Sequence, residues 1–444
     1  MEDPIIQIKN LFNTVISGEW EAIHKIPQSG GDRIYFRIHQ GGQSWIATVS
    51  LNIKENQTFI YFAQHFKAKG LPVPEVLAIN KEGTCYIQED VGTTSLLEVL
   101  EKEGKTDHVF SLFKKSLKSL AELQVKGHQG LDYQKCLTSK LFGNQSIMSD
   151  LLYYKYYFLD SLQYPYDKQA LMNEFELLSD ELASKDFNYF LFRDFQSRNI
   201  MVHNDEVYFI DFQGGMQGGL SYDVASLLWQ AKAELSQEWK DQLLAYYIQE
   251  VNKLLPQALN EAAFRKQYNG FVLLRLLQVL GAYGFRGLFE RKAHFLASIP
   301  LGLNNLKNFL ARTDLKKDTP VFASILQWMV SDEVVARFTP PIANEKTALE
   351  VTIHSFSYKK GIPVDPTDNG GGFVFDMRGI LNPGRFDDYK KLSGLDKPVQ
   401  DFLEQKTKMN VFLNSVWDLV DINVEDYLKR GFASLQINFG CTGG

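Results

Sequence analysis

The first part of the chain alternates apolar and polar positions with a period of two. Residues 33–40 carry an apolar side chain at every second position, and the alternation resumes over residues 43–49 after two glycines. Such alternation predicts half-buried strands, and a Gly-Gly pair suits the tight turn of a hairpin. Together with the run at residues 20–26, the pattern predicts three antiparallel strands. A helix over residues 55–69 and a short buried strand at residues 85–88 are expected to follow.

Beyond residue 95 the apolar positions recur every three to four residues, which predicts a mainly helical region. One β-rich interruption lies within it, formed by short runs at residues 189–192, 199–203 and 207–212. A third pattern begins near residue 349, where predicted strands and helices are mixed, as in an α/β unit. The strands are expected at residues 351–358, 373–379 and 432–439, and the helices at residues 396–407 and 408–419. The proline-containing segment 339–346 is the expected linker before this unit.

Composition and charge narrow the classes of function. The 444 residues include 47 Lys and Arg against 53 Asp and Glu, a net charge of −6, with 45% hydrophobic residues. This composition is typical of a globular chain, and no long basic run suggests a non-specific nucleic-acid binder. The N-terminus lacks a secretory signal, and the most apolar stretch, residues 271–285, contains Arg275 and is shorter than a membrane span. Three scattered cysteines predict neither disulfides nor a zinc site, so we expect a cytoplasmic protein without a membrane segment.

The residues that can carry chemistry gather around the β-rich interruption. Asp194 and Asn199 lie five residues apart in a predicted loop, and Asp211 follows at a strand end twelve residues later. Phosphoryl transfer uses such a set, because the first carboxylate orients the attacking hydroxyl while the amide and the second carboxylate hold Mg²⁺ against the nucleotide phosphates. Loop Asp and Asn residues more often only cap and turn the backbone. Here the strand context and the upstream three-strand lobe stand in the order found in kinases, so the sequence predicts a kinase.

The residues around this motif carry a family resemblance. The blocks are residues 193–202 (RDFQSRNIMV), 210–213, 219–228, 71–76, 88–92 and 277–283. In this order they resemble the aminoglycoside/choline kinase-like phosphotransferase family over about residues 10–335. They are most similar to its bacterial branch that phosphorylates the anomeric hydroxyl of N-acetylmuramate and N-acetylglucosamine in cell-wall recycling.

The resemblance implies an α+β class fold that is bilobal and protein-kinase-like. A small antiparallel β lobe, residues 1–95, would hold the nucleotide loop and hinge, and a large helical lobe, residues 96–340, would hold the catalytic loop with the metal and sugar sites. The implied activity is that of an ATP- and Mg²⁺-dependent sugar kinase, an alcohol-group phosphotransferase. Its partners would be a nucleotide and a small-molecule sugar, with no nucleic acid expected on these lobes.

By the same resemblance, Asp194 would be the catalytic base, and Asn199 and Asp211 would be the Mg²⁺ ligands. Asp223 would brace the catalytic loop. Arg198 could contact a phosphate or an acidic sugar, or could form only a surface ion pair. The nucleotide would be bound by a phosphate loop of Ser29, Gly30, Gly31 and Asp32 and by the backbone of an interlobe hinge of Gln88, Glu89 and Asp90.

One departure from the usual kinase pattern concerns the phosphate-binding lysine. Thr48 stands about where that lysine would be, and the resembled sugar-kinase branch also lacks it. Arg33, Arg37 or Lys54 would then have to supply the positive charge. If none of them reaches the phosphates, the chain would instead be a pseudokinase-type regulatory protein. An aminoglycoside-type antibiotic kinase is a further alternative.

The last part of the chain carries a second resemblance, over residues 350–444. Blocks at residues 355–365, 373–378, 382–383, 392–396 and 440–444 resemble, in order, the C-terminal domain of the RapZ-type RNase adapter family. A Gly-Cys-Thr-Gly-Gly loop after a strand can surround an anion with backbone N–H groups. The resemblance implies an anion or amino-sugar-phosphate pocket lined by Lys359, Lys360, Arg378, Gly440, Cys441, Thr442 and Gly443.

Two alternatives stay open for this C-terminal unit. It could be a structural or dimerising module without a ligand, or it could sense an amino-sugar phosphate or bind RNA as the regulatory part of a pseudokinase. A family member would continue beyond Gly444 with a basic stretch and another helix, so we expect a truncated chain or an incomplete site.

Overall fold

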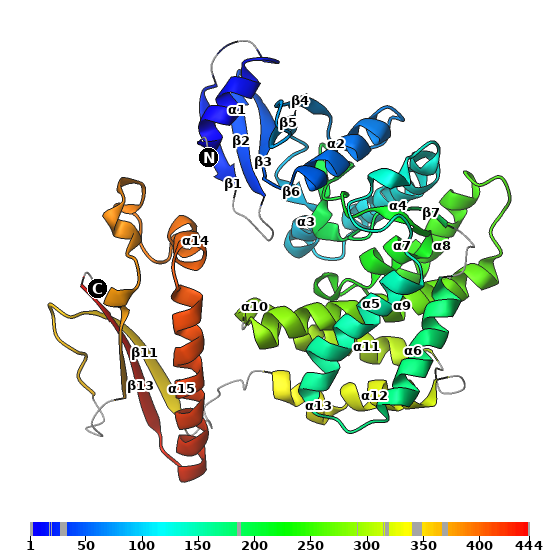
Figure 1. Ribbon diagram of the computed structural model, residues 1–444. Coiled ribbons are helices and arrows are strands. Elements are labelled where there is room, and N and C mark those ends of the chain that lie inside the picture. Colours follow the sequence, from blue (N-terminus) through cyan, green and yellow to red (C-terminus); the bar gives the residue numbers. More distant parts are fainter. Residues whose placement is uncertain are drawn as a thin grey trace. The chain divides into compact units, whose positions relative to one another are not determined.

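The computed structural model describes residues 3–16, 18, 20–26, 33–183, 188–290, 292–313, 315, 319–339, 349–365 and 372–442. The chain forms two compact units, Met1–Thr339 and Pro340–Gly444, which are described separately below (Figure 1). The predicted phosphate loop at residues 29–32, Gly443 and all of the predicted linker except Thr339 lie outside the described residues.

The first unit begins with a five-stranded antiparallel sheet of order β1-β2-β3-β5-β4. It contains the three expected strands and the expected strand near residue 85, together with β4, which the sequence did not predict. The elements of this lobe are α1 (Pro4–Phe12), β1 (Ala22–Ile26), β2 (Ile34–Gln40), β3 (Gln43–Val49), α2 (Ile53–Lys67), β4 (Val76–Ile79) and β5 (Cys85–Glu89). Helix α1 was also not predicted, and its Ile8 and Phe12 pack on Phe36 and Ile38 of the sheet.

The strands of the β-rich interruption belong to two small sheets, which β6 and β10 complete. The order β6-β8-β9 makes one of them, and β7 pairs with β10 in the other. Their strands are β6 (Thr94–Ser95), β7 (Asn188–Leu191), β8 (Ile200–His203), β9 (Glu206–Phe209) and β10 (Met216–Gly219). Asn204 and Asp205 have positive φ angles of 52° and 59°, as the tight turn between β8 and β9 requires. Strand β10 escaped prediction because its Met-Gln-Gly-Gly sequence has no alternating pattern.

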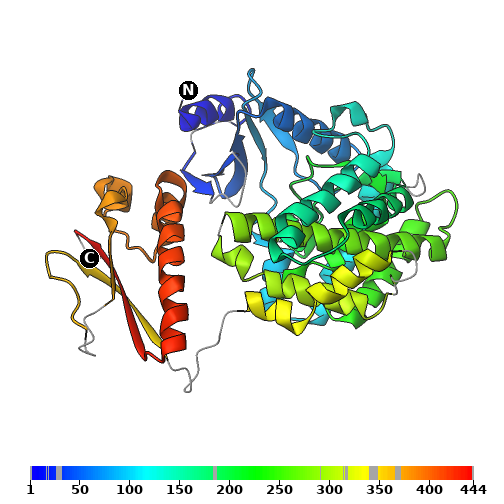
Figure 2. The same cartoon turned by 60° about the horizontal axis from the view of Figure 1, so that its bottom comes forward.

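Helices make up the rest of the first unit (Figures 1 and 2). They are α3 (Leu96–Glu103), α4 (Asp107–His128), α5 (Asn144–Tyr154), α6 (Lys168–Leu182), α7 (Ser221–Leu228), α8 (Gln237–Asn252), α9 (Glu261–Tyr283), α10 (Ala293–Leu296), α11 (Ile299–Leu310), α12 (Pro320–Met329) and α13 (Asp332–Phe338). Helix α9 packs against α5, α7 and α11 and is the central helix of the large core.

A π-helical segment, Gly284–Phe289, continues helix α9. Among the described residues, Glu261–Phe289 is the one helix long and apolar enough to cross a membrane, and 61% of its most apolar window is buried inside the fold. The core helix of a globular unit passes the same test, and the many buried side chains of α9 fit that role.

The second unit is a three-stranded parallel sheet of order β11-β13-β12 with two helices. Its elements are β11 (Glu350–Ser357), β12 (Phe373–Asp376), α14 (Lys397–Lys406), α15 (Met409–Arg430) and β13 (Ser434–Cys441). Two predicted bounds were wrong: β12 ends at Asp376, and α15 continues past residue 419 because Val420, Val424 and Tyr427 keep the helical spacing and pack on the sheet. The expected α+β class, with an antiparallel β lobe, a helical lobe and a C-terminal α/β unit, is confirmed.

Candidate active site

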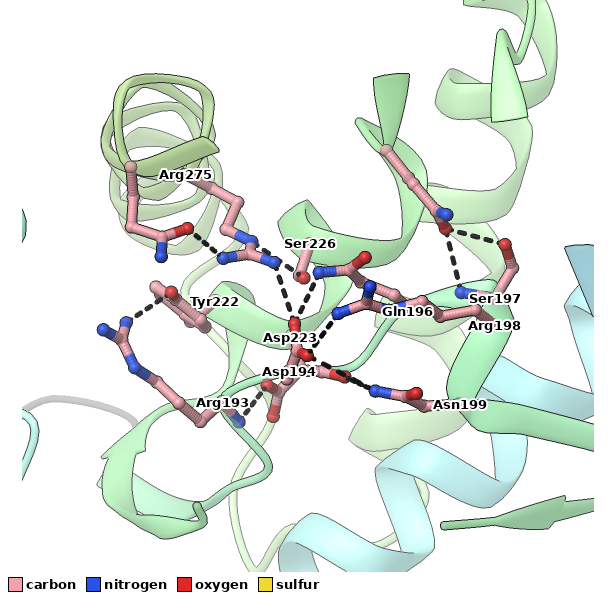
Figure 3. Close-up of polar contacts among 12 residues, drawn as sticks. Arg193, Asp194, Gln196, Ser197, Arg198, Asn199, Tyr222, Asp223, Ser226 and Arg275 are labelled. Atoms are coloured by element: carbon pink, nitrogen blue, oxygen red, sulfur yellow. Dashed lines mark hydrogen bonds and ion pairs between the residues drawn. The ribbon is translucent and has the colours of Figure 1, made fainter. Parts of the chain in front are cut away.

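The loop between β7 and β8 carries the candidate catalytic residues and is anchored by Asp223. The backbone N–H groups of Phe192 and Arg193 donate to the Asp223 carboxylate at 2.8 and 3.0 Å, and Gln124 Nε2 donates to it at 3.1 Å. Asp223 lies on α7 and is fully buried, and this burial raises its pKa to about 7 although the three donors favour the ionised form. The hydrogen bonds fix the backbone immediately before Asp194 (Figure 3).

Arg193 adopts a conformation that is uncommon for a residue with a side chain. Its φ is +81°, in the left-handed region that favours glycine. The side chain compensates with an ion pair from Nη2 to Asp150 Oδ1 at 2.7 Å, a hydrogen bond to the Tyr222 hydroxyl, and a guanidinium 4.5 Å from the ring centroid of Phe142. Backbone strain of this kind persists where surrounding contacts over-determine the conformation, as they do at active sites.

Both carboxylate oxygens of Asp194 accept hydrogen bonds (Figure 3). Oδ1 accepts from Arg275 Nη2 at 3.0 Å and from Gln196 Nε2 at 2.5 Å, while Oδ2 accepts from Arg198 Nη2 at 3.0 Å. Burial alone would raise the pKa of Asp194, but Arg275 and Arg198 outweigh it and lower the pKa overall. Asp194 is therefore an ionised carboxylate of low basicity between two guanidinium groups.

Asn199 and Asp211 are brought together by the pairing of β8 with β9. Ile210 N donates to Asn199 O at 3.1 Å, so Asn199 lies opposite the residue that precedes Asp211. The amide nitrogen of Asn199 donates to the main-chain oxygen of Asp194 at 2.9 Å, which directs its amide oxygen away from that bond. Asp211 has a φ of +68°, a second uncommon backbone conformation in the same site.

These two side chains fit a Mg²⁺ ion bound together with nucleotide phosphates. An amide oxygen and a carboxylate are hard donors, and Mg²⁺ is usually held by one or two such protein ligands plus phosphates and water. Within the described ranges, no group of three or more His, Cys, Asp or Glu side chains could hold a metal. An ion here would therefore depend on the nucleotide for the rest of its ligands.

A chain of polar contacts links Asp211 to Arg33 of the small lobe. Gln213 Nε2 lies 2.7 Å from Asp211 Oδ1 and 3.4 Å from Glu55 Oε1, and Glu55 forms an ion pair with Arg33 at 2.6 Å. Arg33 Nη1 also donates to the Tyr35 hydroxyl at 3.4 Å, and Tyr35 is the cross-strand partner of Thr48. The guanidinium of Arg33 thus contacts the residue paired with Thr48, the position at which the kinase lysine is missing.

The other two cations considered from the sequence are paired elsewhere or exposed. Arg37 donates to Asp90 Oδ2 at 2.6 Å and to Gly92 O at 3.1 Å, and Lys54 is exposed to solvent. The predicted hinge residues also have structural partners: Asp90 further accepts from Ser44, and Glu89 pairs with Lys67 at 2.8 Å. The side chain of Gln88 is buried. Part of the hinge backbone is also paired, because Glu89 N donates to Glu75 O at 2.8 Å.

Several residues at the site were missed by the sequence analysis. Arg275 is the most important, because it contacts Asp194 from α9 although the two lie 81 residues apart. The sequence did contain a signal for Arg275, because a charged residue within the most apolar run of the chain indicates a buried side chain with a partner. The sequence analysis assessed that run only as a possible membrane span. Glu55, Gln196 and Gln213 gave no such signal.

The predicted anion-binding residues of the second unit gather at one edge of its sheet. Parallel strands end at the same edge, and the register pairs Ser357 with Cys441 and Asp376 with Gly440. Lys359, Lys360, Arg378 and Thr442 follow directly after these strand ends. Gly443, the last residue of the predicted site, lies outside the described residues.

Two contacts shape this edge. Ser357 Oγ donates to Thr442 O at 2.9 Å, which joins β11 to the loop after β13. Arg378 forms an ion pair with Asp376 at 2.6 Å, with its guanidinium 4.2 Å from the ring centroid of Tyr358. Gly440 is required here, since a Cβ atom would lie 2.5 Å from the Phe356 ring.

Comparisons with known proteins match both units. Residues 349–444 match the RapZ C-terminal domain. In this part the chain is 37% identical over 99 residues to a nucleotide-binding protein of Clostridium acetobutylicum, covering 22% of this chain and 32% of that protein. It is 35% identical over 103 residues to a nucleotide-binding protein of Shewanella halifaxensis, covering 23% of this chain and 34% of that protein. The chain thus spans about a third of the length of these curated relatives.

The first unit is similar to solved kinase structures at low sequence identity. Choline kinase LicA from Streptococcus pneumoniae is 14% identical with a TM-score of 0.45, covering 69% of this chain and 98% of that one. Amicoumacin kinase hAmiN, in complex with AMP-PNP, Ca²⁺ and Ami, is 13% identical with a TM-score of 0.47, covering 77% of this chain and 96% of that one. Residues 23–259, more than half of the chain, match the model of the phosphotransferase enzyme family. The chain is therefore a member of the phosphotransferase enzyme (APH) family that also carries a RapZ C-terminal domain.

Proposed function

We propose that this phosphotransferase is an ATP- and Mg²⁺-dependent sugar kinase whose acceptor is the anomeric hydroxyl of an N-acetylated amino sugar, N-acetylmuramate or N-acetylglucosamine, in cytoplasmic cell-wall recycling. Residues 1–95 and 96–340 would be its two lobes. One observation carries the proposal: the candidate base Asp194 lies between Arg275 and Arg198. Choline and aminoglycosides are cations, and two guanidinium groups beside the base disfavour a cationic acceptor. A neutral or anionic sugar meets no such repulsion.

The low basicity of Asp194 also fits an anomeric acceptor. An anomeric hydroxyl is more acidic than the other hydroxyls of a sugar, so a weakly basic carboxylate suffices to orient it and accept its proton. The hydroxyl oxygen bonds to the γ-phosphorus of ATP while the bond from that phosphorus to the β-phosphate oxygen breaks. The hydroxyl proton passes through Asp194 to solvent, and ADP leaves with the displaced oxygen.

The other residues would position the nucleotide. Asn199 and Asp211 would hold Mg²⁺, which neutralises charge on the phosphates when bound. Arg33, fixed by Glu55 beside Thr48, would replace the missing lysine as the contact to the phosphates. This arrangement supports an active kinase over a pseudokinase, because a cation is available at the position where the lysine is absent. The carboxyl edge of the second unit would bind an anion such as an amino-sugar phosphate.

Acceptor specificity tests the proposal directly. ADP release is measured with Mg²⁺-ATP across N-acetylmuramate, N-acetylglucosamine, choline and an aminoglycoside, and phosphorus NMR then identifies the product. We expect turnover of at least one sugar, a 1-phosphate product rather than a 6-phosphate, and no turnover of either cation. Turnover confined to the aminoglycoside would support an antibiotic kinase. No turnover of any acceptor together with binding of a sugar phosphate would support the regulatory alternative.

A further inference from the structure

The two arginines that contact Asp194 differ in how they are held. The side chain of Arg275 is 8% exposed, whereas that of Arg198 is 55% exposed. Each contacts a different oxygen of the carboxylate, Arg275 on Oδ1 and Arg198 on Oδ2. The carboxylate therefore has one enclosed side and one side that faces solvent.

Arg275 is anchored on several sides. Its Nε donates to Ser226 Oγ of α7 at 3.0 Å, and its Nη1 donates to Gln278 Oε1 one turn along α9. Ser226 is itself buried. Because Nη2 then reaches Asp194, the guanidinium joins α7, α9 and the catalytic loop (Figure 3). A guanidinium fixed in this way sets the orientation of the Asp194 carboxylate without being available to a ligand.

Arg198 is held only at its tip. The backbone beneath it is fixed, because Ser197 donates through both N and Oγ to Gln230 Oε1 at 2.9 and 2.7 Å. The side chain extends from this fixed turn to Asp194 Oδ2 in an exposed ion pair between residues four apart. Exposed pairs of this kind contribute little and exchange readily. Arg198 can therefore leave Asp194 without any change in the catalytic loop.

The hydrogen bonds leave Oδ2 as the more accessible oxygen of Asp194. Arg275 and Gln196 both donate to Oδ1, whereas Oδ2 accepts from Arg198 at 3.0 Å and from Asn199 Nδ2 at 3.4 Å. When Arg198 leaves, Oδ2 keeps only the longer contact to Asn199 and can accept a hydrogen bond from another group.

We propose that Arg275 is a positioning residue that permanently orients Asp194 through Oδ1, and that Arg198 occupies the place of the acceptor hydroxyl on Oδ2 and is displaced when the acceptor binds. The displaced guanidinium then binds a carboxylate carried by the acceptor, which makes sugar acids the preferred substrate class. This inference rests on the proposed function, since it concerns the acceptor site of the same kinase. It adds a specificity residue and a positioning residue to that site.

A pair of acceptors isolates the role of Arg198. N-acetylmuramate differs from N-acetylglucosamine by a lactyl ether that carries a carboxylate, so a comparison of the two reports on that group. In Arg198→Met we expect the KM for N-acetylmuramate to rise about 10-fold or more, because one charge-assisted hydrogen bond to its carboxylate is lost. The KM for N-acetylglucosamine should change less than about 3-fold, so the ratio of the two KM values reports the contact to the carboxylate.

Substitution of Arg275 should instead lower kcat and leave KM nearly unchanged. In Arg275→Met we expect kcat to fall about 100-fold for both sugars while KM stays within about 3-fold, because the base is misplaced but the acceptor contacts remain. Arg275→Lys should recover part of kcat. If Arg275→Met does not fold, Gln278→Leu removes one anchor of the guanidinium and should lower kcat about 3- to 10-fold. Arg265→Met is the matched control, since it removes an exposed arginine of the same helix that pairs with Glu261.

The outcomes separate the inference from the proposed function. If the wild type phosphorylates neither sugar, the proposed function fails and the inference fails with it. If the wild type phosphorylates both sugars and Arg198→Met leaves the ratio of their KM values unchanged, the inference alone is wrong for Arg198. If Arg275→Met and Gln278→Leu both keep the wild-type kcat, Arg275 is not a positioning residue.

Discussion

Two Asp–Arg pairs that follow strand ends, one in each unit, differ in what surrounds them. Asp194 accepts from Arg275, whose side chain is 8% exposed and is anchored to two helices. Asp376 pairs with Arg378, two residues later, where the two side chains are 46% and 52% exposed. The same two residue types therefore make a fixed constellation in the first unit and an exchangeable surface pair in the second.

The backbone shows the same contrast. Arg193 and Asp211 both have positive φ angles in the first site, and buried partners such as Asp223 maintain the catalytic loop. The edge of the second unit is built from strand ends and short turns, with Gly440 where the backbone passes close to an aromatic ring. The first site therefore depends on distant buried residues, whereas the second depends on local exposed ones.

The largest effect is expected at Asp223, a buried residue that contacts no substrate. Asp223→Asn replaces one acceptor oxygen by a donor opposite two backbone N–H groups, so it should cost about 1–3 kcal/mol of stability and lower kcat about 100-fold. Turnover and urea unfolding measure the two effects. An unchanged kcat would contradict the dependence of the first site on its buried support.

The same variant has a pH signature of defined sign. Burial raises the pKa of Asp223 to about 7 in the folded chain, above the value of about 3.9 for an unfolded aspartate. The stability contributed by its protonation is fully present below about pH 4 and is lost as the pH rises through 7. The stability of the wild type relative to Asp223→Asn should therefore fall between pH 4 and 7, by at most about 1.4 kcal/mol per pH unit. Urea unfolding at several pH values checks this, and a pH-independent difference would contradict it.

An intermediate effect is expected at the link between the lobes. Arg33→Met removes the cation beside Thr48, so the KM for ATP should rise about 10-fold while the KM for the sugar stays unchanged. Steady-state kinetics with each substrate varied in turn measures both. Arg312→Met, which removes an exposed arginine paired with Asp241 at 3.1 Å, is the control and should leave both values unchanged. Equal values for Arg33→Met and this control would mean that another group binds the phosphates.

The smallest effect belongs to the exposed pair. Arg378→Ala should leave the melting temperature and the sugar turnover unchanged and should weaken binding of inorganic phosphate to the second unit about 3- to 10-fold. Hydrogen bonds from Arg378 lower the pKa of Asp376 to about 2, so the pair is intact above about pH 4 and is lost as the pH falls toward 2, opposite in sign to Asp223. Calorimetry with phosphate measures the binding. An equal affinity in wild type and variant would remove Arg378 from the anion site.

The sequence predicted what is local. Asp194, Asn199 and Asp211 are recognisable because their spacing is short, and the strands around them follow from alternating side chains. The pairing of β8 with β9 then brings Asn199 next to Asp211 without any long-range information. The fold class and both family resemblances could be predicted for the same reason, since each depends on blocks in a fixed order.

Most of the missed residues, unlike Gln196, act over long separations in the chain. Arg275 contacts Asp194 across 81 residues, and Gln213 lies near Glu55 across 158. Spacing carries no information about such pairs, because tertiary packing decides which side chains meet. The buried charge in α9 was the one available signal, since a charged residue in a core helix requires a partner.

The central claim is that Asp194 orients the acceptor hydroxyl in an active sugar kinase. The most direct test is single-turnover phosphoryl transfer to the best sugar by Asp194→Asn, with ATP affinity measured on the same sample. The account predicts a rate about 1000-fold below that of the wild type, because a general base contributes on this order, with an ATP affinity within about 3-fold. A near-wild-type rate with intact ATP binding would contradict it.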